Sequence, residues 1–249
     1  MSFWRRDKEV IVHCYTDRAE VYNYFPVTHN KKAIPEWFKK LNAPYFNSPE
    51  DYENNLKLCP GFIDLFKTGF TMPLWSDLFL GVGEKGSKSY RWQYSDMCSA
   101  IQFHNEKQHG GHFKETEFQH FKLMSPWLFQ CKENIEFLAV EPFWQFKDLK
   151  NISIVPGKLK FCIQSTTNIN LFVRRELEKQ EILLPAGSSI QTYIPITEKK
   201  VRIQTHLVSR SKMKKLDKLF YRMSFFNSYG KAAKISSERK CPYKFDVEK

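Results

Sequence analysis

Histidines are concentrated in one short part of the sequence. Four of the seven lie within a stretch of 17 residues, at His104, His109, His112 and His120. Imidazole is a common ligand of zinc and iron, and a carboxylate often completes such sites. The same stretch holds three glutamates, Glu106, Glu115 and Glu117. If a divalent metal, iron or zinc, is the cofactor, we expect His104 and His120 on flanking strands to bind it. The third imidazole would be His109 or His112. The natural comparison is the oxygenase triad, in which two histidines and one carboxylate bind the metal.

The same residues also fit a simpler hypothesis. The segment contains no H-x-H pair and no H-E-x-x-H helix motif, and Gly110-Gly111 interrupts it. A glycine pair is typical of a loop. The alternative to a metal site is therefore a polar, partly exposed hairpin loop without fixed geometry, in which case no cofactor is expected.

Positive charge is concentrated near the C-terminus. The formal net charge of the chain is +12, and residues 199–249 alone hold fifteen Lys and Arg against four Asp and Glu. Within this segment apolar residues recur at three- and four-residue steps among the basic ones, which predicts a basic amphipathic helix. The positions expected to contact a polyanion are Lys212, Lys214, Lys215, Lys218 and Arg222.

Three roles fit this basic segment. Its apolar face can pack on the body while the lysines stay solvated, which is the usual arrangement of a surface helix. Alternatively, the lysines contact nucleic-acid phosphates or dock on an acidic protein. Phosphate contacts would make binding fall steeply with salt concentration.

Aromatic side chains suggest a separate ligand surface. Most of them should fill a β-sheet core, because they occupy alternating strand positions. The segment 141–146 is different, since Pro142 interrupts the expected strand. Exposed aromatics can stack on sugar rings or bases. The residues predicted to form such a surface are Trp127, Phe143 and Trp144.

Several familiar motifs are ruled out by spacing. The six cysteines lie at least 30 residues apart, so none forms the close C-x-x-C pair of a zinc or redox site. The string Gly81–Gly86 matches G-x-G-x-x-G, but alternating tyrosine and tryptophan follow it where the nucleotide-binding motif requires a helix. We therefore predict a β-hairpin turn there.

Length and composition indicate one large, mainly β domain. Of the 249 residues, 42% are hydrophobic and 16% aromatic. Residues 70–209 show many short strand-like segments separated by Gly and Pro turns, which predicts an antiparallel sandwich or barrel of the jelly-roll or cupin-like kind. No apolar run reaches about 18 residues and the N-terminus does not look like a signal peptide. We therefore expect a cytoplasmic protein with no membrane contact.

The remaining elements frame this β region. Residues 9–16 are predicted to form a strand, and residues 19–25 also have β-type aromatics. Proline at a first helical position predicts short helices over 35–41 and 60–68. We expect one β-rich domain over 1–209 and a basic helical tail over 210–249.

An ordered set of short motifs resembles a known family. They are Lys57–Asp64, Gly69–Asp77, His104–Gln108, Lys122–Trp127, Glu141–Phe143, Val155–Gly157 and Leu184–Ile196. Their order is similar to that in a family of hypothetical proteins of marine tailed phages, especially phages of cyanobacteria, with distant bacterial relatives. The resemblance covers about residues 34–200 and leaves out the basic tail. It implies a phage or bacterial origin and one compact β unit, and no activity is known for the family.

Three functions are compatible with the sequence. The first is a non-catalytic accessory or binding protein whose basic tail meets nucleic acid or an acidic partner in the infected cell. The second is a metal-dependent enzyme of the cupin or non-haem iron type that uses the histidine cluster. The third is a structural component of the virion. An enzyme must bring three of the candidate ligands to one point in a pocket, whereas a binding protein need not.

Overall fold

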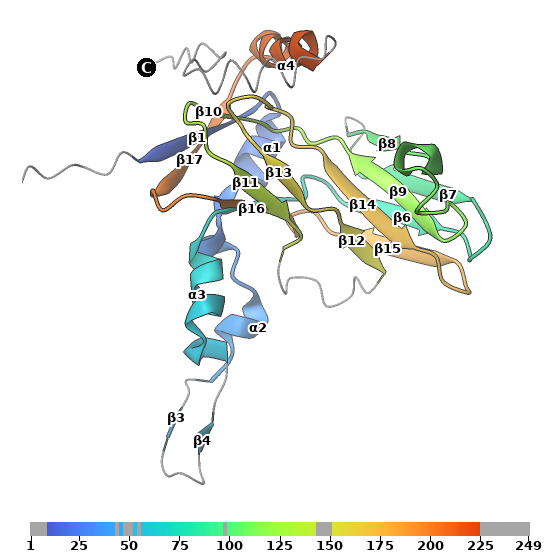
Figure 1. Cartoon of the computed structure of the whole chain (residues 1–249), viewed down its shortest axis with the longest axis horizontal. Helices are drawn as coiled ribbons and strands as arrows, with labels where there is room; N and C mark the ends of the chain where they lie inside the picture. The colour runs from blue at the N-terminus through green and yellow to red at the C-terminus, as the bar shows by residue number, and fades with distance from the viewer. Residues whose placement is uncertain are drawn as a thin grey trace, which may run out of the picture.

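The computed structural model describes residues 9–42, 45–46, 52–53, 56–96, 99–142 and 151–224. Two sheets dominate one side of the molecule, where β1, β10, β16 and β17 lie on the left of Figure 1. Their strand orders are β10-β1-β17 and β13-β11-β16-β5-β2. The strands are β1 (Val10–Thr16), β2 (Thr28–His29), β5 (Phe70–Pro73), β10 (Leu128–Cys131), β11 (Phe137–Val140), β13 (Gly157–Leu159), β16 (Ser189–Pro195) and β17 (Val201–Leu207). All pairs are antiparallel except β1 with β17, which run parallel.

Two further antiparallel sheets form the other side, on the right of Figure 1. Their orders are β12-β14-β9-β8 and β15-β6-β7. The strands are β6 (Leu78–Val82), β7 (Tyr90–Tyr94), β8 (Ile101–Phe103), β9 (Phe118–Leu123), β12 (Ile152–Ile154), β14 (Ile169–Arg174) and β15 (Gln180–Leu184). A small hairpin joins β3 (Tyr45–Phe46) to β4 (Tyr52–Glu53). The expected mainly β fold is confirmed, and no sheet closes into a barrel among the described residues.

Apolar side chains hold the sheets together. Tyr90 of β7 contacts Phe103 of β8 and Phe121 of β9, with ring centroids 4.4 and 6.0 Å apart. One hydrophobic cluster joins both sides of the molecule and includes Val12 of β1 as well as Phe121. Complete burial of a side chain such as Phe121 stabilises a fold by about 1.5–3 kcal/mol. The shared core therefore fixes the position of each sheet relative to the others.

The helices are short apart from the last one. They are α1 (Ala19–Tyr24), α2 (Glu36–Lys39), α3 (Pro60–Lys67) and α4 (Arg210–Ser224), with 3₁₀ turns η1 (Asn30–Lys32), η2 (Leu56–Leu58) and η3 (Glu106–His109). The two expected short helices are confirmed as α2 and α3, which lie together below the sheets in Figure 1. The expected C-terminal helix begins at Arg210. The part of the predicted tail over 225–249 lies outside the described residues.

The prediction of a strand over residues 19–25 is wrong, because this segment forms α1. The amide of Tyr22 donates to the carbonyl of Arg18 at 3.0 Å, and that of Phe25 donates to Val21 at 3.0 Å. Val21 is buried, whereas Tyr24 is 76% exposed. One buried position per turn suits a helix lying on the core, and this tertiary context overrides the β propensity of the aromatic residues.

Strand alternation creates the surface on which the candidate site lies. On β9, Gln119, Phe121 and Leu123 are buried, while Phe118, His120 and Lys122 between them are only partly buried. On β14, Ile169, Leu171 and Val173 are buried, and Asn170 and Phe172 are partly buried. Because successive side chains of a strand point to opposite faces, the partly buried set lines one face of the sheet β12-β14-β9-β8. We call it the outer face.

Candidate functional site

Three of the four clustered histidines come together on the outer face. His104 follows β8, His120 lies on β9, and their ring centroids are 4.8 Å apart. His109, in η3, lies 6.1 Å from the ring of His120. The predicted meeting of flanking-strand histidines with one loop histidine is therefore found. His112 is not part of this group: it is exposed, and its ring contacts that of Phe113 at 4.8 Å.

Phenylalanine rings extend this group. His120 stacks on Phe172 across the β9–β14 pair, with centroids 4.4 Å apart and an interplanar angle of 23°. Phe113, which is 37% exposed, contacts Phe172 at 4.8 Å. His109 contacts Phe172 from the loop side at 5.8 Å. Imidazole and phenyl rings thus form a continuous aromatic surface.

Burial keeps the central histidines uncharged at neutral pH. Desolvation lowers the pKa of His120 to about 4, although its Nε2 lies 3.2 Å from Oδ1 of Asn170. Desolvation also lowers the pKa of His104, and the nearby Lys122 ammonium lowers it further. In the described part of the chain, the Nδ1 atoms of both rings are buried without a hydrogen-bond partner. The rings therefore present flat apolar faces rather than positive charges.

The loop over this group has a defined geometry, contrary to the expectation of an unstructured hairpin loop. The Glu115 carboxylate accepts from the amide of Glu106 at 3.2 Å, and the Glu106 carboxylate accepts from the amide of Glu115 at 3.1 Å. Asn105 caps η3 through the amide of Lys107 at 3.0 Å. Gly110 ends η3 in the left-handed region at φ 64°, which glycine adopts readily. We call these two reciprocal hydrogen bonds the Glu106–Glu115 clamp. The clamp fixes the loop so that His109 lies over the sheet.

The Glu106–Glu115 clamp engages two carboxylates that the metal hypothesis needs as ligands. Glu106 and Glu115, two of the expected carboxylate ligands, accept hydrogen bonds from the loop backbone. Glu115 also lies 3.4 Å from Nζ of Lys88. Among the described residues, no three His, Cys, Asp or Glu side chains are placed so that they could hold a metal ion. The three imidazoles contact one another as tilted rings, with interplanar angles of 37° and 39°, rather than around a common point.

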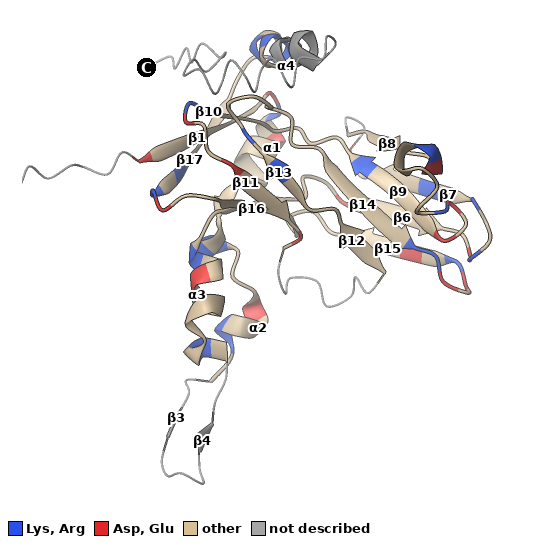
Figure 2. Cartoon of the chain, viewed as in Figure 1, with Lys and Arg blue, Asp and Glu red and all other residues tan. Residues whose placement is uncertain are grey.

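A groove continues the outer face toward the C-terminal helix. Lys122 lies two residues after His120 on the same face of β9, and it also lines a groove of about 370 Å³ beneath α4. Figure 2 shows basic residues both on β9 and at the start of α4. The groove, which we call the α4 groove, is lined by Asp17, Gln102, Lys122, Met124, Ser125, Leu128, Thr166, Asn168, Arg210, Met213, Lys214 and Asp217.

The residues predicted to contact a polyanion all lie on α4. Lys214 and Lys215 are exposed and Lys212 is half-buried. Of these, only Lys214 lines the α4 groove. The side chains of Lys218 and Arg222 lie outside the described part of the chain. Contact of this helix with a polyanion remains a prediction.

The predicted aromatic ligand surface is wrong at Trp127. This side chain is fully buried and belongs to the hydrophobic cluster shared by the sheets. Trp127 therefore stabilises the core and offers no surface to a ligand. Phe143 and Trp144 lie outside the described residues. Sequence reasoning missed Phe172 and Phe113, although the alternation on β14 and the neighbouring histidines were visible signals.

A second histidine pair has no signal in the sequence. Nδ1 of His13 on β1 lies 3.0 Å from Nε2 of His206 on β17, 193 residues away. Tyr15 stacks on His206 with centroids 4.9 Å apart. Desolvation lowers the pKa of both imidazoles. One imidazole must be neutral to accept the hydrogen bond, so the pair joins the parallel strands most firmly when at most one ring is charged.

Arg175 is a second feature that sequence reasoning missed. Only 2% of this residue is exposed. Its guanidinium donates to the carbonyls of Glu115, Gly83 and Ser89 at 2.8, 3.0 and 2.8 Å. It also donates to Oε1 of Gln119 at 3.1 Å. Arg175 therefore ties the histidine-bearing loop to the β6–β7 hairpin, which gives it a structural role.

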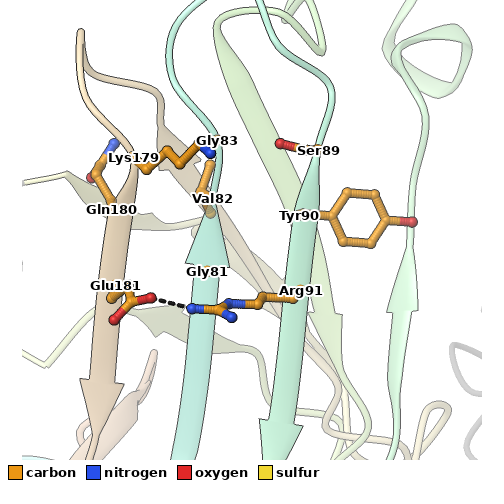
Figure 3. A pocket seen from close by; sticks show the side chains of 9 residues that line it. All are labelled: Gly81, Val82, Gly83, Ser89, Tyr90, Arg91, Lys179, Gln180 and Glu181. Carbon is orange, nitrogen blue, oxygen red and sulfur yellow. Dashed lines mark hydrogen bonds and ion pairs between the residues drawn. The ribbon is translucent and has the colours of Figure 1, made fainter.

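The G-x-G string forms the expected hairpin. Gly81 lies on β6, which pairs with β7 along its whole length. Arg91 of β7 crosses over Gly81 to pair with Glu181 of β15, and a Cβ at Gly81 would lie 2.5 Å from Cγ of Arg91 (Figure 3). A shallow pocket of about 310 Å³ is lined by these residues. The glycine gives space to a cross-strand ion pair and does not cradle a phosphate.

No protein-family model and no curated protein matches this sequence. None of the helices in the described segments combines the length and the apolarity needed to cross a membrane.

Proposed function

We propose that this chain is a non-catalytic accessory protein of the tailed-phage type and that it binds single-stranded nucleic acid on its outer face. The observation that carries the proposal is the placement of stacked rings and cationic side chains on one continuous surface. His120, Phe172 and Lys122 occupy neighbouring positions of the β9–β14 pair. Proteins that bind single strands combine aromatic platforms for bases with a basic path for phosphates.

The ring group supports binding of unpaired bases. Phe172 is covered by His120 on one side and approached by Phe113 and His109 from the loop. Neutral rings stack on bases without discriminating strongly among them, because every base has a π face. A duplex hides these faces inside its base stack. The surface therefore favours a single strand over a duplex and over an acidic protein, which offers no flat bases.

The cations support binding of the backbone. Lys122 lies about 7 Å along β9 from His120, a separation that one nucleotide can bridge. Beyond it, Arg210 and Lys214 of α4 line the α4 groove. None of these three cations has an ion-pair partner within the described segments. They are therefore available to phosphates.

The first test measures affinity by fluorescence anisotropy with a labelled pyrimidine-rich single strand and with the corresponding duplex. We expect the single strand to bind more tightly and its affinity to fall with salt. The double variant Arg210→Glu, Lys214→Glu should bind at least about tenfold more weakly. It should also lower the slope of log affinity against log salt by about 1.4, since each single-strand phosphate contact contributes about 0.7. Glutamate has about the same helix propensity as lysine and arginine, so α4 should persist.

The matched control is the double variant Lys199→Glu, Lys200→Glu, which changes the net charge by the same amount in the exposed turn before β17. That turn and α4 lie at opposite ends of this seven-residue strand, about 23 Å apart. The control should bind as the wild type does. Absence of single-strand binding, or equal weakening by the control and the α4 variant, would contradict the proposal.

A second candidate function follows from the three imidazoles. Two of them carry buried Nδ1 atoms without a hydrogen-bond partner in the described segments. Rotation of these rings could direct them to one iron or zinc ion, the metals expected from the sequence. Metal content of protein purified without chelator, measured for the wild type and for His104→Ala and His109→Ala, tests this candidate. Near-stoichiometric metal that both variants lose would favour it, and a metal-free folded wild type would reject it.

A further inference from the structure

The face that α4 turns toward the sheets is unusual for a helix packed on a β body. Arg210, Met213, Lys214 and Asp217 line the groove, and their spacing of three and four residues places them on one side of the helix. A surface helix normally turns its apolar stripe inward. Among the described side chains of α4, those that line the groove are three charged residues and one methionine. The α4 groove is consequently a polar space rather than a closed apolar contact.

Opposite α4, the groove wall comes from four separate parts of the chain. Gln102 lies on β8 and Lys122 on β9, while Asp17 follows β1 and Asn168 precedes β14. At about 370 Å³, the groove falls at the small end of ligand pockets, which span about 300–1,000 Å³. Segments this far apart in the sequence meet only in the complete fold, so the groove is a product of tertiary structure.

Charges of both signs restrict what the groove can hold. The cations are Lys122, Arg210 and Lys214, and the carboxylates are Asp17 and Asp217. Carboxylates only accept hydrogen bonds when ionised, whereas ammonium and guanidinium groups only donate. A ligand that satisfies both sets must therefore bring an anionic group together with N–H or O–H donors. Inorganic phosphate has only its own O–H groups as donors, so it offers fewer donors to the two carboxylates than a larger anion with separate N–H and O–H groups does.

The uncharged lining completes the description. Gln102, Thr166 and Asn168 can each donate and accept hydrogen bonds, whereas the Ser125 hydroxyl already accepts from Trp127 and Thr167. Met124, Leu128 and Met213 supply apolar contact, and thioether sulfur packs well against flat rings. An anionic group, polar hydroxyls and a flat ring with amino donors are the parts of a nucleotide.

We infer that the α4 groove binds one nucleotide through its phosphate monoester. Arg210, Lys214 and Lys122 are positioned to donate to the phosphate, and the carboxylates to accept from sugar hydroxyls or a base amino group. The groove lies at the end of the outer face, so this inference rests on the proposed function and extends it. The monoester can belong to a free mononucleotide or to the phosphorylated end of a strand.

The experiment separates these two sources. Nucleoside 5′-monophosphates, the parent nucleosides and inorganic phosphate are titrated by calorimetry into the full-length wild type. In parallel, anisotropy compares three otherwise identical strands of about 12 nucleotides, a length suited to compact single-strand binders. One strand carries a 5′ phosphate, one a 3′ phosphate and one neither. The variant is Lys214→Gln, and the matched control is Lys199→Gln.

We expect one of the phosphorylated strands to bind at least about tenfold more tightly than the unphosphorylated strand, as suits charge-assisted hydrogen bonds. Lys214→Gln should remove this preference, and Lys199→Gln should keep it. If the site takes free nucleotides instead, the monophosphates bind in calorimetry, more tightly than nucleosides or inorganic phosphate, and Lys214→Gln weakens them.

Two negative results have different meanings. Equal binding of all three strands together with no binding of monophosphates overturns the nucleotide groove and leaves single-strand binding standing. Failure of every strand to bind overturns the proposed function, and the monophosphate titration then decides the groove by itself. Equal losses in Lys214→Gln and Lys199→Gln also reject the groove.

Discussion

At the scale of single residues, His120 shows how burial decides what a side chain contributes. It lies between Phe172 and the imidazoles of His104 and His109, and its pKa falls to about 4 because it is desolvated. The ordinary pKa of histidine is about 6.5. The folded protein therefore binds a proton at this site less readily than the unfolded chain does. In the proposed binding of a single strand at neutral pH, His120 then acts as a ring and not as a cation.

This difference predicts how stability depends on pH. The unfolded chain takes up the His120 proton as the pH falls below about 6.5, whereas the folded protein does so only near pH 4. Stability is therefore lost between these values as the solution is acidified. We expect His120→Gln to reduce that loss by about 1 kcal/mol after allowance for solvent screening. Urea unfolding at pH 7 and pH 4.5 measures it.

The control for this experiment is His112→Gln, which removes an exposed imidazole outside the group of His104, His109 and His120. It should lose as much stability on acidification as the wild type. If His120→Gln and the control have the same pH dependence, His120 is not held neutral by its surroundings.

Arg175 is the residue on which the histidine-bearing loop depends most. Replacing it by methionine would remove the guanidinium donor from the carbonyls of Glu115 and Gly83, while the Ser89 carbonyl keeps the amide of Gly83 as a donor. Buried acceptors without partners cost about 1–3 kcal/mol each, in part relieved by water. We therefore expect Arg175→Met to lower the free energy of unfolding by about 3 kcal/mol in urea titrations.

Its neighbour provides the comparison. Arg174 is exposed, and it is hydrogen-bonded through its backbone. Its amide donates to the carbonyl of Asn151, and its carbonyl accepts from Nε2 of Gln180. Arg174→Met should change stability by no more than about 0.5 kcal/mol. Similar losses in the two variants would show that the buried guanidinium does not tie the loop to the hairpin.

At the scale of elements, the reciprocal Glu106–Glu115 clamp fixes the loop between β8 and β9. Glu106→Ala removes the acceptor of the Glu115 amide and frees one end of the loop. We expect faster hydrogen exchange at the amides of residues 106–115, equivalent to about 1 kcal/mol of local stability. Exchange measured by NMR tests this. Glu117→Ala, an exposed glutamate after the clamp, is the control, and equal acceleration in both would refute the clamp.

Some elements could be predicted from the sequence because their signal is local. The alternation on β9 and β14, the Pro-initiated α2 and α3, and the hairpin after Gly81 all follow from neighbouring residues. The helix α1 could not be predicted, because its aromatics favour a strand and only docking of Val21 on the core decides its state. The fixed geometry of the loop that contains η3 depends on hydrogen bonds between Glu106 and Glu115, which lie nine residues apart. No periodicity in the sequence indicates that these two residues interact.

At the scale of the whole molecule, the candidate site is assembled from distant segments. The histidine concentration on β9 and its loop could be predicted, as could the basic helix. The proximity of the histidine-bearing sheet and α4, which share the α4 groove, could not be predicted from the sequence. It depends on the position of β17, which places α4 beside the edge of another sheet. The pairing of His13 with His206 has the same cause. The parallel pairing of β1 with β17 brings together the first and the last strand of the fold.

This assembly also explains why charge alone is a poor guide to function here. The basic segment over residues 199–249 carries most of the net charge. The surface proposed to bind nucleic acid, however, joins only part of that segment to uncharged rings from β9, β14 and the loop. A single strand should therefore contact both the outer face and α4, whereas a polyanion bound by charge alone would contact the basic segment and ignore the rings.

Photo-crosslinking tests this central claim most directly. A single strand containing 5-iodouracil is irradiated with the full-length protein, and the crosslinked residues are mapped by mass spectrometry. We predict crosslinks at rings of the outer face, above all Phe172, Phe113 and His120, and their loss when an excess of unlabelled single strand is added. Crosslinks confined to other sheets or to residues 225–249, with none on the outer face, would contradict the account.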